Sequence, residues 1–102
     1  MSFTLKFEKH ALIEWNALDN GVRQHLKKKL QKRLEHPHVE NEKLHGSLRG
    51  CYKIKNNKTG HRLVYQVIDD ELIVLVLSVD KREDLAAYLS AAARVGHQGH
   101  DE

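Results

Sequence analysis

The sequence predicts one α+β domain in which an antiparallel-dominated, four-stranded sheet carries an N-terminal helix hairpin and a C-terminal helix. Three observations indicate this: a period-two apolar pattern at the N-terminus, two helical patterns behind it, and three strand-like runs closed by another helical pattern. The length of 102 residues suits one domain. We expect residues 1–95 to form it and the polar residues 96–102 to form a flexible tail.

The N-terminal segment predicts a strand followed by a short helix. Residues 2–7 alternate apolar and polar side chains, as a strand buried on one face does. Apolar residues then recur at helical spacing at Ala11, Leu12, Trp15 and Leu18. Turn-forming residues 19–21 should end this helix.

A longer, basic helix is predicted next. Its apolar stripe repeats every four residues, at Val22, Leu26, Leu30 and Leu34, and lysines and arginines spread around the rest. Pro37 should end it, because a proline disfavours the helical conformation of the preceding residue. The short break between the two helices favours an antiparallel hairpin. Residues 38–50 show no sustained period and read as a loop.

The second half of the chain predicts an antiparallel meander and a closing helix. The strand-like runs cover residues 51–56, 61–69 and 71–80. Residues 72–77 are apolar at odd and even positions alike, so this strand should lie inside the sheet and be covered on both faces. Residues 81–95 follow as a helix, with helical spacing at Leu85, Tyr88, Leu89 and Ala92.

Composition favours a polyanionic partner. The chain has 17 Lys and Arg against 14 Asp and Glu, a net charge of +3. Its longest apolar run, residues 72–77, is far shorter than the ~20 residues that cross a bilayer. The N-terminus carries charged residues where a signal peptide needs an apolar run, and Cys51 is the single cysteine. We expect a cytoplasmic protein without a membrane partner.

A cluster of cations is predicted on the first hairpin of the meander. Alternation sends Lys53 and Lys55 to one face. If residues 57–60 form a four-residue loop, Asn56 pairs with His61 and Lys55 with Arg62, so the three cations share a face and His61 points away. A slip of one residue would move Arg62 to the other face. Facing like charges destabilise a sheet unless an anion neutralises them; ordinary solvated side chains are the alternative interpretation.

A second group of candidates follows the strand predicted to be buried. Lys81 and Arg82 stand at its end, where the core holds side chains rigidly, and Tyr88 lies six residues further on. Solvation at a helix start is the alternative for the two cations. Packing against the core is the alternative for Tyr88.

Several short motifs occur in a fixed order along the chain. They are Val22-Arg23, Lys27-Lys28-Lys29-Leu30, Leu44-His45-Gly46, Cys51-Tyr52-Lys53-Ile54-Lys55, Arg62-Leu63-Val64-Tyr65-Gln66-Val67-Ile68-Asp69, Ser78-Val79 and Lys81-Arg82. From about Phe3 to Val95 their order and spacing resemble the RelE toxins of bacterial toxin–antitoxin pairs. The resemblance implies a fold like that of small microbial ribonucleases. It also implies metal-independent cleavage of mRNA in the A site of the 70S ribosome, by attack of a 2′-hydroxyl on the adjacent phosphate.

Carried over position by position, the active residues of the family fall on Lys53, Lys55, Arg62, Arg82 and Tyr88. Crowding of like charges favours the neutral form of a lysine, so Lys55 is the expected base, with Lys53 beside it. The two arginines would stabilise phosphate charge, and Arg82 would act at the leaving oxygen by proton donation, a relay or charge alone. Tyr88 would orient the nucleotide by stacking or hydrogen bonding.

The resemblance also implies partners. We expect a RelB-like antitoxin with an acidic segment, and contacts with 16S ribosomal RNA from Arg23, Lys27, Lys28, His45 and Lys81. His45 stands where relatives can carry an arginine, and the loop at residues 47–50 is slightly longer. ParE toxins share the architecture but act on DNA gyrase, which is the alternative function. No cofactor is expected, and the histidine pairs 36/38 and 97/100 lack the further ligands that a metal site needs.

Overall fold

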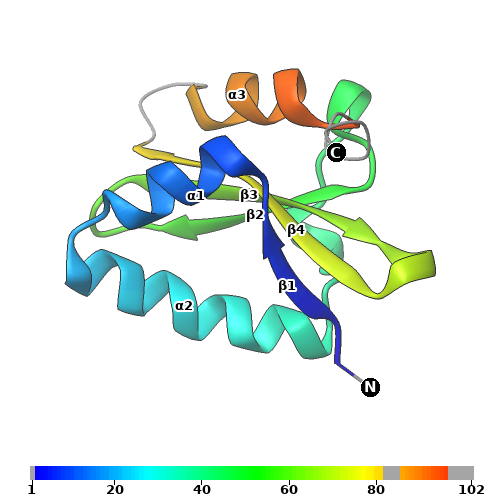
Figure 1. The fold of residues 1–102 in the computed structure, drawn as a ribbon, viewed down its shortest axis with the longest axis horizontal. Helices are drawn as coiled ribbons and strands as arrows, with labels where there is room; N and C mark the ends of the chain where they lie inside the picture. The colour runs from blue at the N-terminus through cyan, green and yellow to red at the C-terminus, as the bar shows by residue number, and fades with distance from the viewer. Residues whose placement is uncertain (1, 82–85, 97–102) are drawn as a thin grey trace.

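The sheet lies between two layers of helices. The computed structural model describes residues 2–81 and 86–96. Figure 1 shows α1 and α2 on one side of the sheet and α3 on the other. The helices and strands are β1 (Thr4–Phe7), α1 (Lys9–Asn16), α2 (Asn20–Glu35), β2 (Cys51–Asn56), β3 (His61–Ile68), β4 (Ile73–Lys81) and α3 (Ala86–Arg94). Short 3-10 turns cover Glu40–Glu42, Gly46–Leu48 and Asp69–Glu71.

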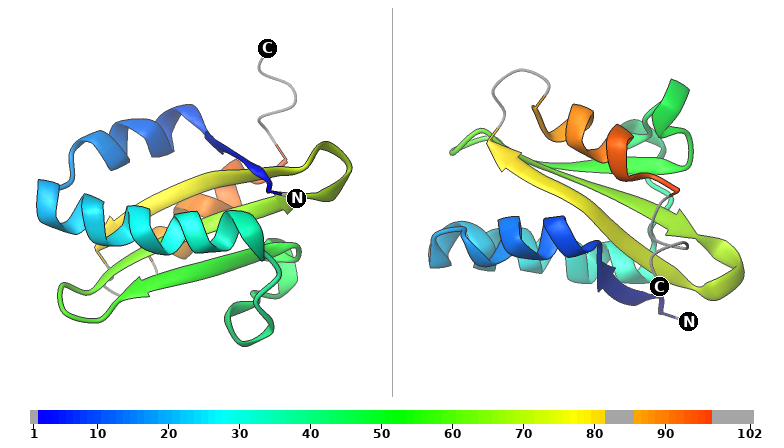
Figure 2. Two further views of the ribbon diagram at one scale, coloured as in Figure 1. Left: turned by 90° about the horizontal axis from the view of Figure 1, so that it is seen from below. Right: turned by 45° about the horizontal axis from the view of Figure 1, so that its top comes forward.

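The strand order is β1-β4-β3-β2, so β4 and β3 are internal. β4 pairs in parallel with β1 and antiparallel with β3, and β3 pairs antiparallel with β2. The predicted fold class and the internal position of the most apolar strand are therefore confirmed. The helices α1 and α2 run in opposite directions as the predicted hairpin (Figure 2).

Two hydrophobic clusters cover the two faces of the sheet. The cluster under α1 and α2 consists of Ala11, Leu26, Leu30, Tyr52, Ile54, Leu63, Tyr65, Val74, Val76 and Val79. The cluster under α3 consists of Leu48, Cys51, Val64, Leu75, Leu77, Ala87 and Ala91. Alternate residues of β4 contribute to both clusters, which is why its sequence is apolar at odd and even positions.

A bulge in β4 changes which side chains face α3. Tyr65 pairs with Val76 but Val64 pairs with Ser78, so Leu77 is the extra residue on β4. As a result, Leu77 and Ser78 both contribute to the α3 side: Leu77 packs in that cluster, and the buried Ser78 hydroxyl donates to the Ala87 carbonyl at 2.7 Å. The bulge therefore ties the start of α3 to the sheet.

The ends of the helices follow their local sequence. Glu8 caps α1, because its carboxylate accepts from the backbone amides of His10 and Ala11 at 2.8 and 2.9 Å. Helix α2 ends at Glu35, and His36 is non-helical with φ −141° before Pro37, as predicted. No helix within the described part of the chain is long and apolar enough to cross a membrane.

Some predicted boundaries and core positions were wrong. The last strand begins at Ile73 instead of residue 71, because the preceding residues form a 3-10 turn that ends at Leu72 in a left-handed conformation, φ 55°. Lys81 belongs to β4, not to the final helix. Leu12 and Leu89 are 43% and 67% exposed; the fully buried residue of α1 is Ala11, and those of α3 are Ala87 and Ala91. Leu85 and tail residues 97–102 lie outside the described residues.

Candidate active site

The hairpin of β2 and β3 has the predicted register. Asn56 pairs with His61, Lys55 with Arg62, and Lys53 with Val64. Val64 and Cys51 belong to the cluster under α3, so Lys53, Lys55 and Arg62 share the sheet face that carries α3. All three are partly buried. We call Lys53, Lys55 and Arg62 the cationic cluster.

The guanidinium of Arg62 is held close to the hairpin loop. Its Nη1 donates to the carbonyls of Gly60 and His61, both at 3.2 Å. On the other side Arg62 pairs with Asp80 of β4, which brings one carboxylate residue to the same face. The face around Arg62 is thus formed by three adjacent strands.

The outer edge of β2 is closed by α2 and the preceding loop. The carbonyls of Lys53 and Lys55 accept from Arg33 at 3.2 Å and from Lys29 at 2.8 Å. The neighbouring Cys51 carbonyl accepts from the Leu44 amide at 2.9 Å. These contacts fix the backbone under both lysines of the cationic cluster, as a site needs. Sequence analysis missed them; the spacing of four residues between Lys29 and Arg33, which puts both on one helix side, was the available signal.

Arg33 also belongs to a buried hydrogen-bond chain. It donates to the Tyr65 hydroxyl at 2.8 Å, and Tyr65, which is fully buried, donates to the Pro37 carbonyl at 2.8 Å. Burial raises the pKa of Tyr65, although the Arg33 hydrogen bond and charge act to lower it. The Tyr65 ring stacks on Tyr52 with centroids 5.7 Å apart. These hydrogen bonds connect the end of α2 with the central sheet and with the carbonyl of Lys53.

Tyr88 lies on the same face of the sheet as the cationic cluster. It is partly buried on α3 and packs against the cluster of Cys51, Val64 and Leu77. Lys81 is exposed and pairs with His61, so it faces away from Arg62. Arg82 lies outside the described residues. The structure therefore brings three of the predicted residues together, sets Tyr88 on the helix above that face, and separates Lys81 from them.

The predicted RNA-binding residues differ in their surroundings. Lys27, Lys28 and His45 are exposed. Arg23 is partly buried and caps the end of α1, donating to the Leu18 carbonyl at 2.8 Å. Its guanidinium is therefore already engaged within the protein.

His61 lies away from the cationic cluster, as alternation predicted. Desolvation and the nearby Lys81 lower its pKa, and its Nδ1 is 2.8 Å from the Thr59 hydroxyl. Among residues 2–81 and 86–96, no group of three or more His, Cys, Asp or Glu side chains is arranged to hold a metal ion.

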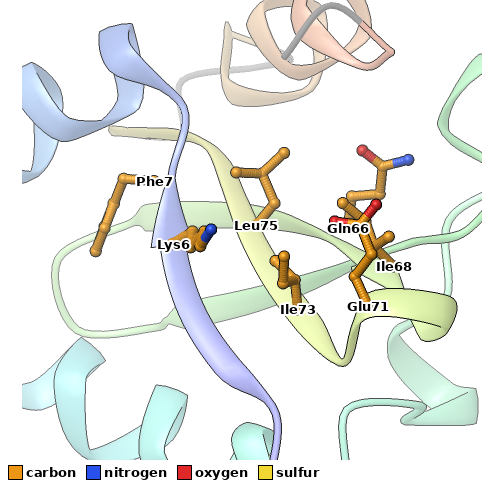
Figure 3. A pocket seen from close by; sticks show the side chains of 7 residues that line it. All are labelled: Lys6, Phe7, Gln66, Ile68, Glu71, Ile73 and Leu75. Carbon is orange, nitrogen blue, oxygen red and sulfur yellow. The ribbon is translucent and has the colours of Figure 1, made fainter. Parts of the chain in front are cut away.

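A separate cavity of about 450 Å³ opens beside β1. Figure 3 shows its lining side chains, which come from β1, β3, β4 and the turn before β4: Lys6, Phe7, Gln66, Ile68, Glu71, Ile73 and Leu75. The buried Gln66 Oε1 lacks a hydrogen-bond partner within the described part of the chain. Among the described residues, none of those predicted for catalysis or RNA binding lines this cavity.

The fold and the cationic face describe a small α+β protein with a cluster of cations on one side of its sheet, and comparison with known proteins gives its family. Residues 5–86 match the family described as ParE toxin of type II toxin-antitoxin system, parDE. The mRNA interferase toxin RelE of Escherichia coli K12 is 48% identical over 95 residues, which are 93% of this chain and 99% of that protein. The chain therefore belongs to the RelE/ParE family of toxins.

Solved structures agree with this assignment. A double arginine-to-alanine mutant of E. coli RelE in the free state matches with a TM-score of 0.85 and 47% identity, covering 93% of this chain and 99% of that one. The toxin in the intact E. coli RelBE toxin–antitoxin complex matches with a TM-score of 0.78 and 49% identity, covering 81% and 100%. The Mycobacterium tuberculosis RelBE2 complex, at 21% identity and a TM-score of 0.67, shares the fold.

Proposed function

We propose that this chain is the toxin of a type II toxin–antitoxin system and a ribosome-dependent endoribonuclease that cuts mRNA in the A site. The observation that carries the proposal is the hairpin register, which sets Lys55 opposite Arg62 and Lys53 on the same face. A curated relative with 48% identity is named an mRNA interferase. Three cations on one partly buried face suit a phosphodiester and its extra transition-state charge.

The proposed reaction is a transesterification. Lys55, in its neutral form, takes the proton of the 2′-hydroxyl, and the 2′-oxygen attacks the adjacent phosphorus. The bond from phosphorus to the 5′-oxygen breaks, leaving a 2′,3′-cyclic phosphate and a 5′-hydroxyl that takes up a proton. Lys53, on the same face, binds the phosphate.

The other proposed residues stabilise charge and orient the nucleotide. Arg62 grips phosphate oxygens with its guanidinium, which must leave the Gly60 and His61 carbonyls to reach them. Arg82 acts at the leaving oxygen, by donating or relaying a proton or by its charge alone. Tyr88 stacks on a base or hydrogen-bonds to it.

The ribosome and an antitoxin are the proposed partners. A site that lacks the His and Glu pair of familiar ribonucleases gains from a ribosome that holds mRNA in an in-line geometry. The exposed Lys27, Lys28 and His45, with Lys81, would contact 16S ribosomal RNA, while Arg23 would first have to leave α1. Relatives were solved in complex with RelB, so a RelB-like antitoxin is proposed to restrain this chain in the cytoplasm.

The test adds purified protein to ribosomes programmed with a defined mRNA and maps the new 5′ ends. Replacement of Lys55 or Arg62 by alanine should each lower the cleavage rate by about a hundredfold. The matched control Lys9→Ala, an exposed lysine at the start of α1, should leave the rate unchanged. A 2′-deoxy substitution at the scissile nucleotide should abolish cleavage, and undiminished cutting of that substrate would refute the mechanism.

A ParE-like action on DNA gyrase is the second candidate, because the matched family is described by ParE. The same preparation distinguishes the two. Intact mRNA on programmed ribosomes, together with gyrase-dependent DNA breaks, would favour the gyrase function and contradict the nuclease.

A further inference from the structure

Beyond the cationic cluster, one ion pair connects helices that lie on opposite faces of the sheet. Arg94, in the last turn of α3, donates through Nη2 to Glu14 Oε2 at 2.8 Å and through Nη1 to Glu14 Oε1 at 3.1 Å. Glu14 belongs to α1. The Arg94 and Glu14 side chains are only 17% and 27% exposed. We call this pair the Glu14–Arg94 bracket.

The bracket sits on the edge of β4 where β1 has ended. The last pair between these strands is Phe7 with Val76. Beyond it, the Val79 amide donates to Glu14 at 3.0 Å, and the Leu77 carbonyl accepts from Arg94 at 2.8 Å. The bracket thus satisfies the carbonyl of the bulge residue Leu77 and the amide of Val79, and no other side chain of the described residues bonds to these two groups. The hydrogen bonds that Arg94 donates to Glu14, opposed by burial, raise the pKa of Arg94, so its guanidinium stays charged.

Apart from the bracket, α3 is attached to the sheet by side-chain packing, mainly of alanines and Tyr88, and by one hydrogen bond at its start. It has nine residues, and a helix of this length is marginal without tertiary contacts. Its fully buried residues are the small Ala87 and Ala91, whereas Leu89 is 67% exposed. The hydrogen bond from Ser78 to the Ala87 carbonyl holds its start, and the bracket holds its end. Tyr88 lies between these two attachments.

We propose that Glu14 and Arg94 are positioning residues for Tyr88, because their ion pair fixes where α3 lies over the sheet. The inference rests on the proposed nuclease function, in which Tyr88 contacts the nucleotide. Without the bracket, the end of α3 would be held only by the packing of Ala91, Ala92 and Val95 on the sheet, and the Tyr88 ring could shift over the face that carries the cationic cluster. A displacement of about 1 Å in an active site can lower a rate by about a hundredfold.

A double-mutant cycle separates positioning from general stability. Single-turnover cleavage on programmed ribosomes is measured for Arg94→Ala, Tyr88→Ala and the double variant. Arg94→Ala should lower the cleavage step by about tenfold or more, with substrate binding changed much less. In the Tyr88→Ala background the same change should have an effect of less than about twofold, because its target is gone. Arg94→Lys, which keeps the charge, should recover part of the rate.

Glu14→Gln keeps an acceptor for the Val79 amide and removes the carboxylate charge. If Arg94→Ala does not fold, the double-mutant cycle is run with Glu14→Gln in its place. Lys43→Ala, which breaks the surface pair of Lys43 with Glu40, is the matched ion-pair control and should change nothing. Additive effects of Arg94→Ala and Tyr88→Ala, or unchanged cleavage by Arg94→Ala, would overturn the positioning role. Unchanged cleavage by Tyr88→Ala alone would contradict the role of Tyr88 on which this inference rests, whereas absence of cleavage by the unaltered protein would contradict the proposed function itself.

Discussion

Removal of one buried hydroxyl tests the hydrogen-bond chain that joins α2 to the sheet. Tyr65→Phe keeps the ring and its stacking on Tyr52 but removes the oxygen that accepts from Arg33 and donates to the Pro37 carbonyl, each at 2.8 Å. Tyr65 is fully buried, so water cannot replace these bonds without rearrangement. We expect a marked loss of stability with little change in fold.

The size of the expected stability loss follows from the two hydrogen bonds of the Tyr65 hydroxyl. The neutral bond to Pro37 contributes about 1 kcal/mol, and the charge-assisted bond from Arg33 about 1.5–3 kcal/mol. Arg33 is partly exposed and keeps its contact with the Lys53 carbonyl, so the lower part of that range applies. The expected decrease in the free energy of unfolding is therefore about 2–3 kcal/mol, or a melting temperature lower by roughly 10 °C for a domain of this size.

Urea unfolding followed by far-UV circular dichroism measures this decrease, provided that the m-value is unchanged. Tyr52→Phe is the matched control: it removes a hydroxyl for which residues 2–81 and 86–96 offer no hydrogen-bond partner. It should cost less than about 1 kcal/mol. Equal losses of unfolding free energy in the two variants, or a loss below about 0.5 kcal/mol for Tyr65→Phe, would show that the Arg33–Tyr65–Pro37 hydrogen bonds do not stabilise the fold.

Two further predictions concern titratable groups. Burial acts to raise the pKa of Glu8, but hydrogen bonds from His10 and Ala11 outweigh it and the pKa is lowered from 4.5; the capping carboxylate therefore stabilises the fold above that value and loses its effect as pH falls through the lower folded value. Glu8→Gln should reduce the free energy of unfolding by about 1 kcal/mol near neutrality and by less at acid pH, and a pH-independent difference in urea titrations would contradict this. Burial raises the pKa of Cys51 to about 11, so iodoacetamide should modify it only after unfolding; rapid alkylation of the native protein would refute its burial.

The elements and the hairpin register could be predicted because their signals are local. A four-residue loop fixes the pairing of Lys55 with Arg62, and the stripe at Leu26 and Leu30 fixes the buried side of α2. Pro37 marks the helix end for the same reason. Such features depend on residues a few positions apart, which a sequence displays directly.

The side-chain contacts around the site could not be predicted in the same way. Arg94 and Glu14 are 80 residues apart, and only the folded sheet edge brings them together. Leu89 is exposed although it lies at helical spacing with other apolar residues, because a short apolar pattern is compatible with two faces and the fully buried positions of α3 are Ala87 and Ala91. In the sequence, Lys29 does not differ from the neighbouring solvated lysines; its hydrogen bond to the Lys55 carbonyl is visible only in the structure.

The closed carbonyl row of β2 has a consequence for solubility. A strand at the edge of a sheet normally has free backbone N–H and C=O groups, with which a strand of another molecule can pair. Here the ammonium and guanidinium groups of α2 already occupy those acceptors, at Lys55 and Lys53. This leaves a second chain fewer acceptors for intermolecular pairing at the edge where Lys53 and Lys55 lie.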